Sequence, residues 1–152
     1  MSFDAAAAIY AREIVTTRVF NAPRDLVWRA WSEPARLSEW WGPKGFSDTT
    51  HAFEFRPGGA WRHTMHGPDG KDYANEAAFV DIVPPQRIVM DHLSWPHFRL
   101  TVTFDTIGER TKITFRQLFA SVADYEKLRP IAVPANEENF DKLAAVLATM
   151  RR

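Results

Sequence analysis

The sequence predicts an α+β protein in which a curved antiparallel sheet of about seven strands wraps around a long C-terminal helix. Three observations indicate this class. Short segments alternate apolar and polar residues, two helix start signals follow the first of them, and an apolar stripe at helical spacing ends the chain. A sheet and a helix that each have one apolar face are expected to pack against each other.

The first strand is expected at residues 13–20, which are rich in β-branched and aromatic residues. Further strands are separated by short segments that contain Gly, Pro or Asp, which favour turns. Their expected ranges are 52–56, 61–66, 72–83, 87–93, 98–105 and a last strand that includes 113–119. Seven strands joined by short turns indicate an antiparallel meander.

Two short helices are expected within residues 21–45, a segment that holds four of the six tryptophans. Asn21 is the expected cap of the first helix and Pro23 its first residue, while Ser32 and Pro34 have the same roles in the second.

A change of period after the last strand predicts two more helices. The first is short and extends from Ser121 to about Leu128, and the second covers about residues 135–150, with Pro130 and Pro134 between them. A helix of this length is about 24 Å long. Because a twisted sheet contacts a straight helix along only part of its length, a cavity is expected between them, closed at one side by the two short helices.

Composition limits the function. A chain of 152 residues predicts a single domain, 1–152, with an ordered core at about 12–150 and an N-terminal extension at 1–11. Positive and negative residues balance at 19 each, so nothing favours nucleic acid or an anionic membrane as partner. The absence of cysteine excludes disulfides and thiolate chemistry. Residues 4–10 lack the basic head of a signal peptide and no apolar run could span a bilayer, so we expect a cytoplasmic protein.

Six short motifs lie between residues 18 and 89. They are Arg18-Val19-Phe20-Asn21-Ala22-Pro23, Ala30-Trp31-Ser32-Glu33-Pro34, Trp40-Trp41-Gly42-Pro43, Phe55-Arg56-Pro57-Gly58-Gly59, Gly67-Pro68-Asp69-Gly70 and Val83-Pro84-Pro85-Gln86-Arg87-Ile88-Val89. In this order the chain resembles the heat-shock-protein-90 ATPase activators and their small bacterial homologues over about residues 12–150. The resemblance implies the helix-grip (START-like, Bet v-like) fold of the SRPBCC, or polyketide cyclase-like, superfamily.

That superfamily includes lipid carriers, hormone receptors, cyclases and co-chaperones. Relatives usually carry Gly-Trp at the start of the last helix, where this chain has Ala135-Asn136. We expect the missing ring to widen the cavity or to change its lining.

Nine residues are candidates for the cavity wall: Trp40, Trp41, His63, Met65, Glu76, Met90, Phe98, Phe115 and Phe140. The two adjacent tryptophan rings cannot point the same way, so one is expected beside the cavity and the other outside it. Glu76 lines the cavity if its face of the strand is the inner one, and is an ordinary surface residue if that face is the outer one.

Two pairs of histidines lie close together in the sequence. His63 and His66 are three residues apart on a strand and should face opposite sides, so we expect no shared metal ion. His92 and His97 flank the Ser94-Trp95-Pro96 corner and are expected on a loop surface.

The sequence supports three functions. The first is non-enzymatic binding of a small hydrophobic molecule, and the second is a co-chaperone-like interaction with another protein. The third is a cyclase or hydrolase that uses His63 or Glu76 for general acid–base chemistry. No phosphate-binding loop, GxSxG or HExxH motif is present, so no catalytic residue, metal or cofactor is assigned. The expected assembly is a monomer or a homodimer.

Overall fold

The computed structural model describes residues 11–150. All but the last residue of the predicted N-terminal extension, 1–11, lies outside the described residues. In chain order the elements are β1 (Glu13–Phe20), α2 (Arg24–Ser32), α3 (Pro34–Trp40), β2 (Ser47–Phe53), β3 (Ala60–His66), β4 (Asp72–Val83), β5 (Arg87–His92), β6 (Phe98–Ile107), β7 (Arg110–Phe119) and α4 (Val122–Met150).

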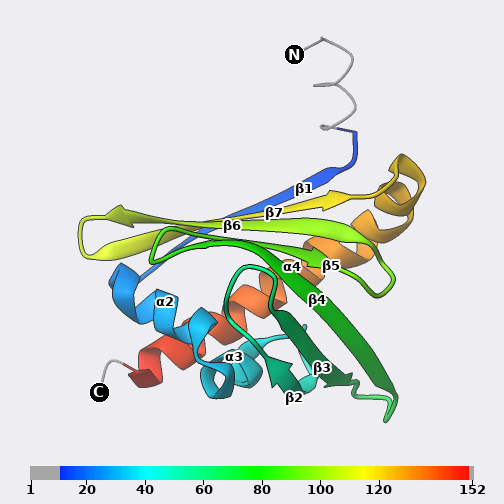
Figure 1. Ribbon diagram of the computed structural model, residues 1–152. Helices are drawn as coiled ribbons and strands as arrows, with labels where there is room; N and C mark the ends of the chain where they lie inside the picture. Colours follow the sequence, from blue (N-terminus) through cyan, green and yellow to red (C-terminus); the bar gives the residue numbers. More distant parts are fainter. Residues whose placement is uncertain (1–10, 151–152) are drawn as a thin grey trace.

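The seven strands form one antiparallel sheet in the order β1-β7-β6-β5-β4-β3-β2. All three helices lie on the same side of this sheet, with α4 running beneath it and α2 and α3 beside the C-terminal half of α4 (Figure 1). Helix α4 packs on β1 and β7, and α3 packs on β2 and α4. The arrangement confirms the predicted α+β helix-grip fold.

The core lies between the concave face of the sheet and the helices. From α4, Phe140 packs edge-on against Phe20 at 5.4 Å and Phe115 at 5.6 Å between ring centroids. From α2, the ring of Trp31 lies 5.7 Å from that of Phe104. Each fully buried side chain of this size contributes about 1.5–3 kcal/mol to folding, so the aromatic core holds the two short helices and α4 against one face.

The C-terminal region is one helix, so the expected break at Pro130 and Pro134 is wrong. A proline inside a helix removes one hydrogen bond and costs about 3 kcal/mol. These two prolines lie four residues apart and therefore on one side of α4, which is continuous through both. Contacts of the opposite side with the sheet, including a hydrogen bond from Asn136 to Gln117, outweigh the local preference.

Strand β2 begins five residues before its expected start. Its first part, Ser-Asp-Thr-Thr-His, is polar and lacks the apolar alternation of a half-buried strand. Pairing with β3 from Ser47–His66 to Phe53–Trp61, with a bulge between Thr50 and Ala52, sets its range instead. A polar sequence suits β2 because it is an edge strand.

The expected helix caps Asn21 and Ser32 are wrong. Pro23 and Glu33 occupy the cap positions of α2 and α3, and Pro34 is the first residue of α3 as expected. Ser32, the expected cap, is instead the last residue of α2.

Candidate functional site

A cavity of about 250 Å³ lies between α4 and the inner face of strands β3 to β7. The segment that follows α3 closes one side of it. Most of its lining is apolar. The apolar lining residues are Trp41, Pro43, Met65, Pro96, Phe98, Phe115, Ala132 and Ala135.

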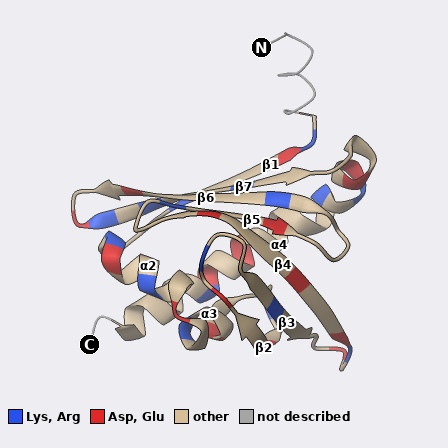
Figure 2. Ribbon diagram, in the orientation of Figure 1, with Lys and Arg blue, Asp and Glu red and all other residues tan. Residues whose placement is uncertain are grey.

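The polar part of the wall consists of side chains without formal charge. They are Asn75, His92, Gln117, Asn136 and Asn139. No Asp, Glu, Lys or Arg lines this cavity within the described part of the chain. Figure 2 shows the charged residues dispersed over the elements, with both signs interspersed. An apolar wall with a few polar groups is typical of sites for small molecules.

Gln117 and Asn136 form a hydrogen-bonded pair of amides on the cavity wall. Asn136 Nδ2 donates to Gln117 Oε1 at 2.7 Å and to Thr16 Oγ1 at 3.3 Å. Gln117 is only 7% exposed and Thr16 6%. The pair joins α4 to the sheet and holds both amides in place on the cavity wall.

His92 is held at the cavity wall by three contacts. Its Nδ1 lies 2.7 Å from the Pro96 carbonyl oxygen and its Nε2 lies 2.9 Å from Asn75 Oδ1. The ring stacks on Phe98 with 4.7 Å between centroids. Burial lowers the pKa of His92 below its usual value, although hydrogen bonds to the backbone of Pro96 and Ser94 act in the opposite direction. Because the Pro96 carbonyl can only accept, Nδ1–H donates to it.

Two residues of α4 fix the chain after α3, which carries Trp41. Asn139 Nδ2 donates to the Trp40 carbonyl at 2.9 Å, and its Oδ1 accepts from the Gly42 amide at 3.2 Å. Lys142 Nζ donates to the carbonyls of Gly42 and Phe46 at 3.2 and 2.9 Å. Burial lowers the pKa of Lys142. The partners of Asn139 and Lys142 in these contacts are all backbone groups. The contacts therefore fix the backbone at this side of the cavity and do not depend on the neighbouring side chains.

Gly42 has a structural requirement of its own. Its φ is +107°, a conformation that L side chains rarely adopt, and a Cβ here would lie 3.1 Å from Met65 Cε. Glycine therefore allows the turn that brings Trp41 to the cavity.

Four of the nine candidate residues line this cavity: Trp41, Met65, Phe98 and Phe115. Trp40, Met90 and Phe140 are buried in the core and do not reach it. Ala135 and Asn136 do line it, so the departure from the Gly-Trp of relatives lies at the cavity wall.

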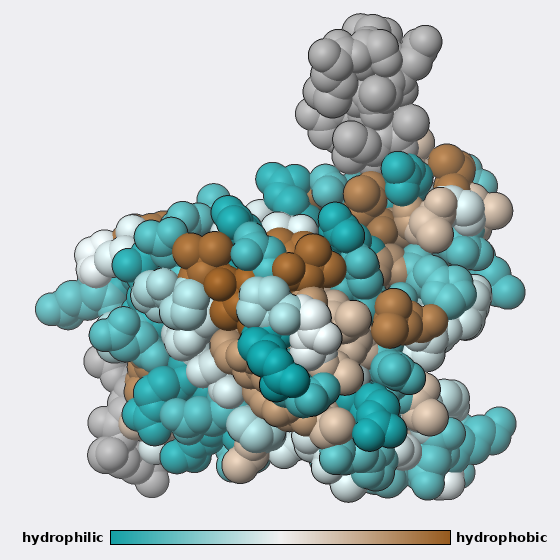
Figure 3. Space-filling view, viewed as in Figure 1, coloured by the Kyte–Doolittle hydropathy of each residue, from teal (hydrophilic) through white to brown (hydrophobic). Residues whose placement is uncertain are grey.

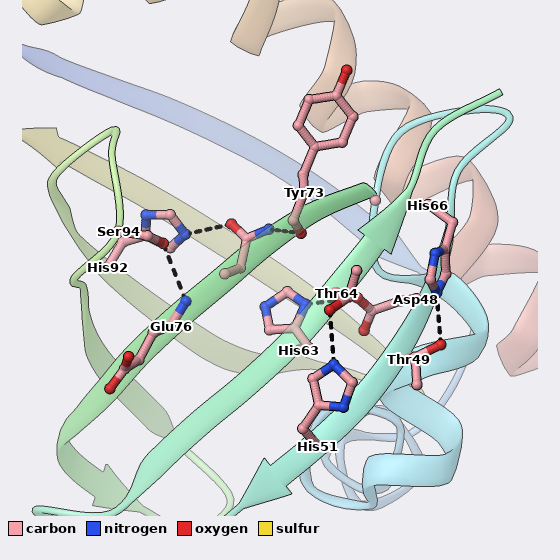
Figure 4. Close-up of polar contacts among 12 residues, drawn as sticks. Asp48, Thr49, His51, His63, Thr64, His66, Tyr73, Glu76, His92 and Ser94 are labelled. Atoms are coloured by element: carbon pink, nitrogen blue, oxygen red, sulfur yellow. Dashed lines mark hydrogen bonds and ion pairs between the residues drawn. The ribbon is translucent and has the colours of Figure 1, made fainter. Parts of the chain in front are cut away.

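His63 and Glu76 do not line the cavity either. His63 is buried, its Nδ1–H donates to Asp48 Oδ1 at 2.6 Å, and its ring stacks on Trp61 at 4.1 Å. Glu76 is exposed, and its carboxylate extends away from the His63 ring (Figure 4). The inward position considered for Glu76 is wrong because Asn75, Ala77 and Phe79 occupy the inner face of β4.

The remaining histidines also differ in their surroundings. His66 is partly exposed and bonds Asp72 and Thr49, each at 2.7 Å, whereas His63 faces the interior. No three His, Cys, Asp or Glu side chains within residues 11–150 could hold a metal ion together. His92, expected on a loop surface, is the last residue of β5 and lines the cavity. One indication of this position was present in the sequence, because His92 lies within the expected strand 87–93 and not in the turn that follows.

Sequence reasoning also missed the amide side chains. Gln117 shares its face of β7 with Phe115, and Asn75 shares its face of β4 with Ala77 and Phe79. Alternation with these apolar residues could have indicated inward-facing amides.

Comparison with known proteins identifies the family. The family described as "Activator of Hsp90 ATPase homolog 1-like protein" matches residues 21–148. The chain belongs to this family. No curated protein matches the chain. Within the described residues, no helix has the length and apolar character needed to cross a membrane.

Solved structures of bacterial proteins share the fold of this family member. A protein from Arthrobacter aurescens has 25% identity and a TM-score of 0.86, over 93% of this chain and 88% of that one. A protein from Nitrosomonas europaea has 18% identity and a TM-score of 0.85, over 93% and 97%. A protein from Rhodobacter sphaeroides has 24% identity and a TM-score of 0.83, over 91% and 93%.

Proposed function

We propose that this protein binds a small, mainly hydrophobic molecule in the cavity between α4 and the sheet. The observation that carries the proposal is the mainly apolar space of about 250 Å³ between α4 and the sheet. An apolar cavity of about 150 Å³ holds benzene, whereas most ligand pockets measure about 300–1,000 Å³. The volume therefore suits a compound of one or two rings.

The wall is already arranged for binding. Trp41 packs edge-on against Trp61 at 4.9 Å and Trp31 at 5.8 Å, so its ring has little freedom to move. Phe98 is held by its stacking on His92. A wall that is rigid before binding loses little conformational entropy when a ligand enters.

A thermal-shift screen with one- and two-ring hydrophobic compounds tests the proposal. A ligand at 100 times its dissociation constant should raise the free energy of unfolding by about 2.7 kcal/mol. Ala135→Phe places a ring into the cavity and should abolish the shift. Val133→Phe is the matched control, because Val133 is exposed on α4 and does not line the cavity.

The two variants and the screen have distinct outcomes. A shift that Val133→Phe keeps and Ala135→Phe loses supports binding in this cavity. The proposal fails if no compound shifts the wild type, or if Ala135→Phe leaves the shift unchanged.

The description of the family supports a second candidate, activation of a chaperone ATPase. Figure 3 shows exposed apolar side chains on the viewed face in separate areas among hydrophilic ones, so a partner there would meet a mixed surface. The test measures the ATPase rate of an Hsp90-type chaperone with and without the protein, together with direct binding. An unchanged rate without binding counts against this candidate.

The acid–base enzyme considered from the sequence has no comparable support. Glu76 is exposed on the outer face and the His63 ring is enclosed by Asp48 and Trp61. A cytoplasmic location remains part of the proposal, and the absence of cysteine fits a reducing compartment.

A further inference from the structure

The Gln117–Asn136 amide pair has unused hydrogen-bonding capacity. Asn136 Nδ2 gives its bonds to Gln117 Oε1 and Thr16 Oγ1. Within the described residues, Gln117 Nε2 and Asn136 Oδ1 have no hydrogen-bond partner in the protein. Neither atom is fully buried, so both are accessible to another molecule. Since both residues line the cavity, one donor and one acceptor remain available there.

This conclusion does not depend on how the two amides are oriented. If both were rotated by 180°, Gln117 Nε2 would donate to Asn136 Oδ1, and Gln117 Oε1 and Asn136 Nδ2 would be the free atoms. Each arrangement leaves one amide nitrogen and one amide oxygen without a protein partner, because the bond between the two side chains uses one of each. The pair therefore presents a complementary donor and acceptor in either case.

The rest of the wall disfavours a charged ligand. None of the residues that line the cavity is Asp, Glu, Lys or Arg. Nearby cations have other partners: Lys142 binds two backbone carbonyls, and Arg18 binds Glu137 and Asp141, each at 2.7 Å. A carboxylate or ammonium group would leave water without meeting an opposite charge, which is costly.

We propose that the cavity selects a neutral ring compound that carries an adjacent N–H donor and C=O acceptor, as a lactam or a carboxamide does, and that Gln117 and Asn136 recognise these two groups. The proposal rests on the proposed function, because it names the class of ligand for the same cavity. Without such a ligand, water would form hydrogen bonds with the free amide groups. A purely apolar ligand would displace that water and leave them unpaired.

Three two-ring compounds of similar size test the proposal. They are 2-quinolinone, which has the adjacent N–H and C=O, naphthalene, which has no polar group, and 2-naphthoate, which is charged. Affinities are measured by NMR titration of the full chain labelled with ¹⁵N. We expect 2-quinolinone to bind about tenfold more tightly than naphthalene or better, and 2-naphthoate to bind most weakly.

The side-chain amide signals of Gln117 and Asn136 provide a second measurement. They should move with 2-quinolinone and much less with naphthalene. Gln117→Leu should reduce the affinity for 2-quinolinone to that for naphthalene without weakening naphthalene. The comparison of the three compounds on the wild type remains decisive if this variant does not fold.

The outcomes separate this proposal from the proposed function. If naphthalene binds as tightly as 2-quinolinone, or 2-naphthoate binds best, the selection of a lactam-like group is wrong while the cavity still binds ligands. If none of the three compounds binds but other apolar compounds shift the melting temperature, the ligand class is again wrong. If no apolar compound of any kind binds, both proposals fail.

Discussion

The indole rings of Trp40 and Trp41 lie 5.5 Å apart, yet only Trp41 borders the cavity. Helix α3 ends at Trp40, and the chain continues at Trp41 in an extended conformation with ψ of 131°. The two side chains therefore diverge. Trp40 is fully buried and its Nε1 donates to the Ala30 carbonyl at 3.0 Å.

Alanine substitutions of these two residues should have different effects. Trp40→Ala removes a buried ring and a buried hydrogen bond, and should lower the free energy of unfolding by about 3–5 kcal/mol. Trp41→Ala removes a half-buried ring, so we expect a smaller loss of about 1–3 kcal/mol together with weaker ligand binding. Urea unfolding and ligand-induced thermal shifts measure both effects. Equal losses of stability with unchanged binding would show that both rings serve only the core.

The stability should depend on pH through His92. Burial places the folded-state pKa of His92 below that of the unfolded chain, about 6.5. The unfolded state therefore binds more protons between these two values, so the free energy of unfolding should decrease as the pH falls below about 6.5. This loss continues until the pH reaches the folded-state pKa.

His92→Gln should remove this part of the pH dependence. His51→Gln serves as the control, because His51 is exposed and is not among the groups that shift the pKa of His92. Urea unfolding at pH 8, 7, 6 and 5 provides the comparison. If the free energy of unfolding decreases below pH 6.5 as steeply in His92→Gln as in the wild type, the assignment to His92 is contradicted.

Asn139→Ala should loosen the link between α4 and the end of α3. The substitution leaves the Trp40 carbonyl and the Gly42 amide without their present partner. The expected loss of unfolding free energy is about 1–3 kcal/mol. Glu138→Ala is the matched control, because among residues 11–150 its side chain has one hydrogen bond, to the Lys44 amide, which is long at 3.4 Å and exposed. A loss for Glu138→Ala as large as for Asn139→Ala would mean that the helix itself, and not the link, is affected.

The neighbouring glycines of the turn before β3 should tolerate alanine unequally. A Cβ on Gly58 would meet nothing within 4 Å, so the cost there comes only from its φ of +84° and should be about 1–2 kcal/mol. A Cβ on Gly59 would overlap the Glu54 carbonyl oxygen and lie 2.8 Å from Glu54 Cβ. Gly59→Ala should cost about 3 kcal/mol or more. Circular dichroism during thermal unfolding ranks the two variants, and the reverse order would show that the turn can rearrange around Gly59.

Local patterns in the sequence determined most of the secondary structure. Alternation from Phe98 to Asp105 predicted β6, and the stripe through Phe140, Leu143 and Leu147 predicted the buried face of α4. Such patterns are reliable because burial on one face requires apolar residues at the period of the element. The family motifs likewise depend only on residue order, and the family match over 21–148 bears them out.

Only the tertiary structure decided how the cavity is lined. Asn75, His92, Gln117 and Asn136 come from β4, β5, β7 and α4, so no local pattern could bring them together. Alternation separated Glu76 from Asn75 but could not say which of them faces α4, because alanines flank Glu76 on its own face as well. The continuity of α4 through Pro130 and Pro134 was likewise settled by packing against the sheet. In each case the deciding free energy comes from contacts between segments far apart in the chain, which the local sequence does not contain.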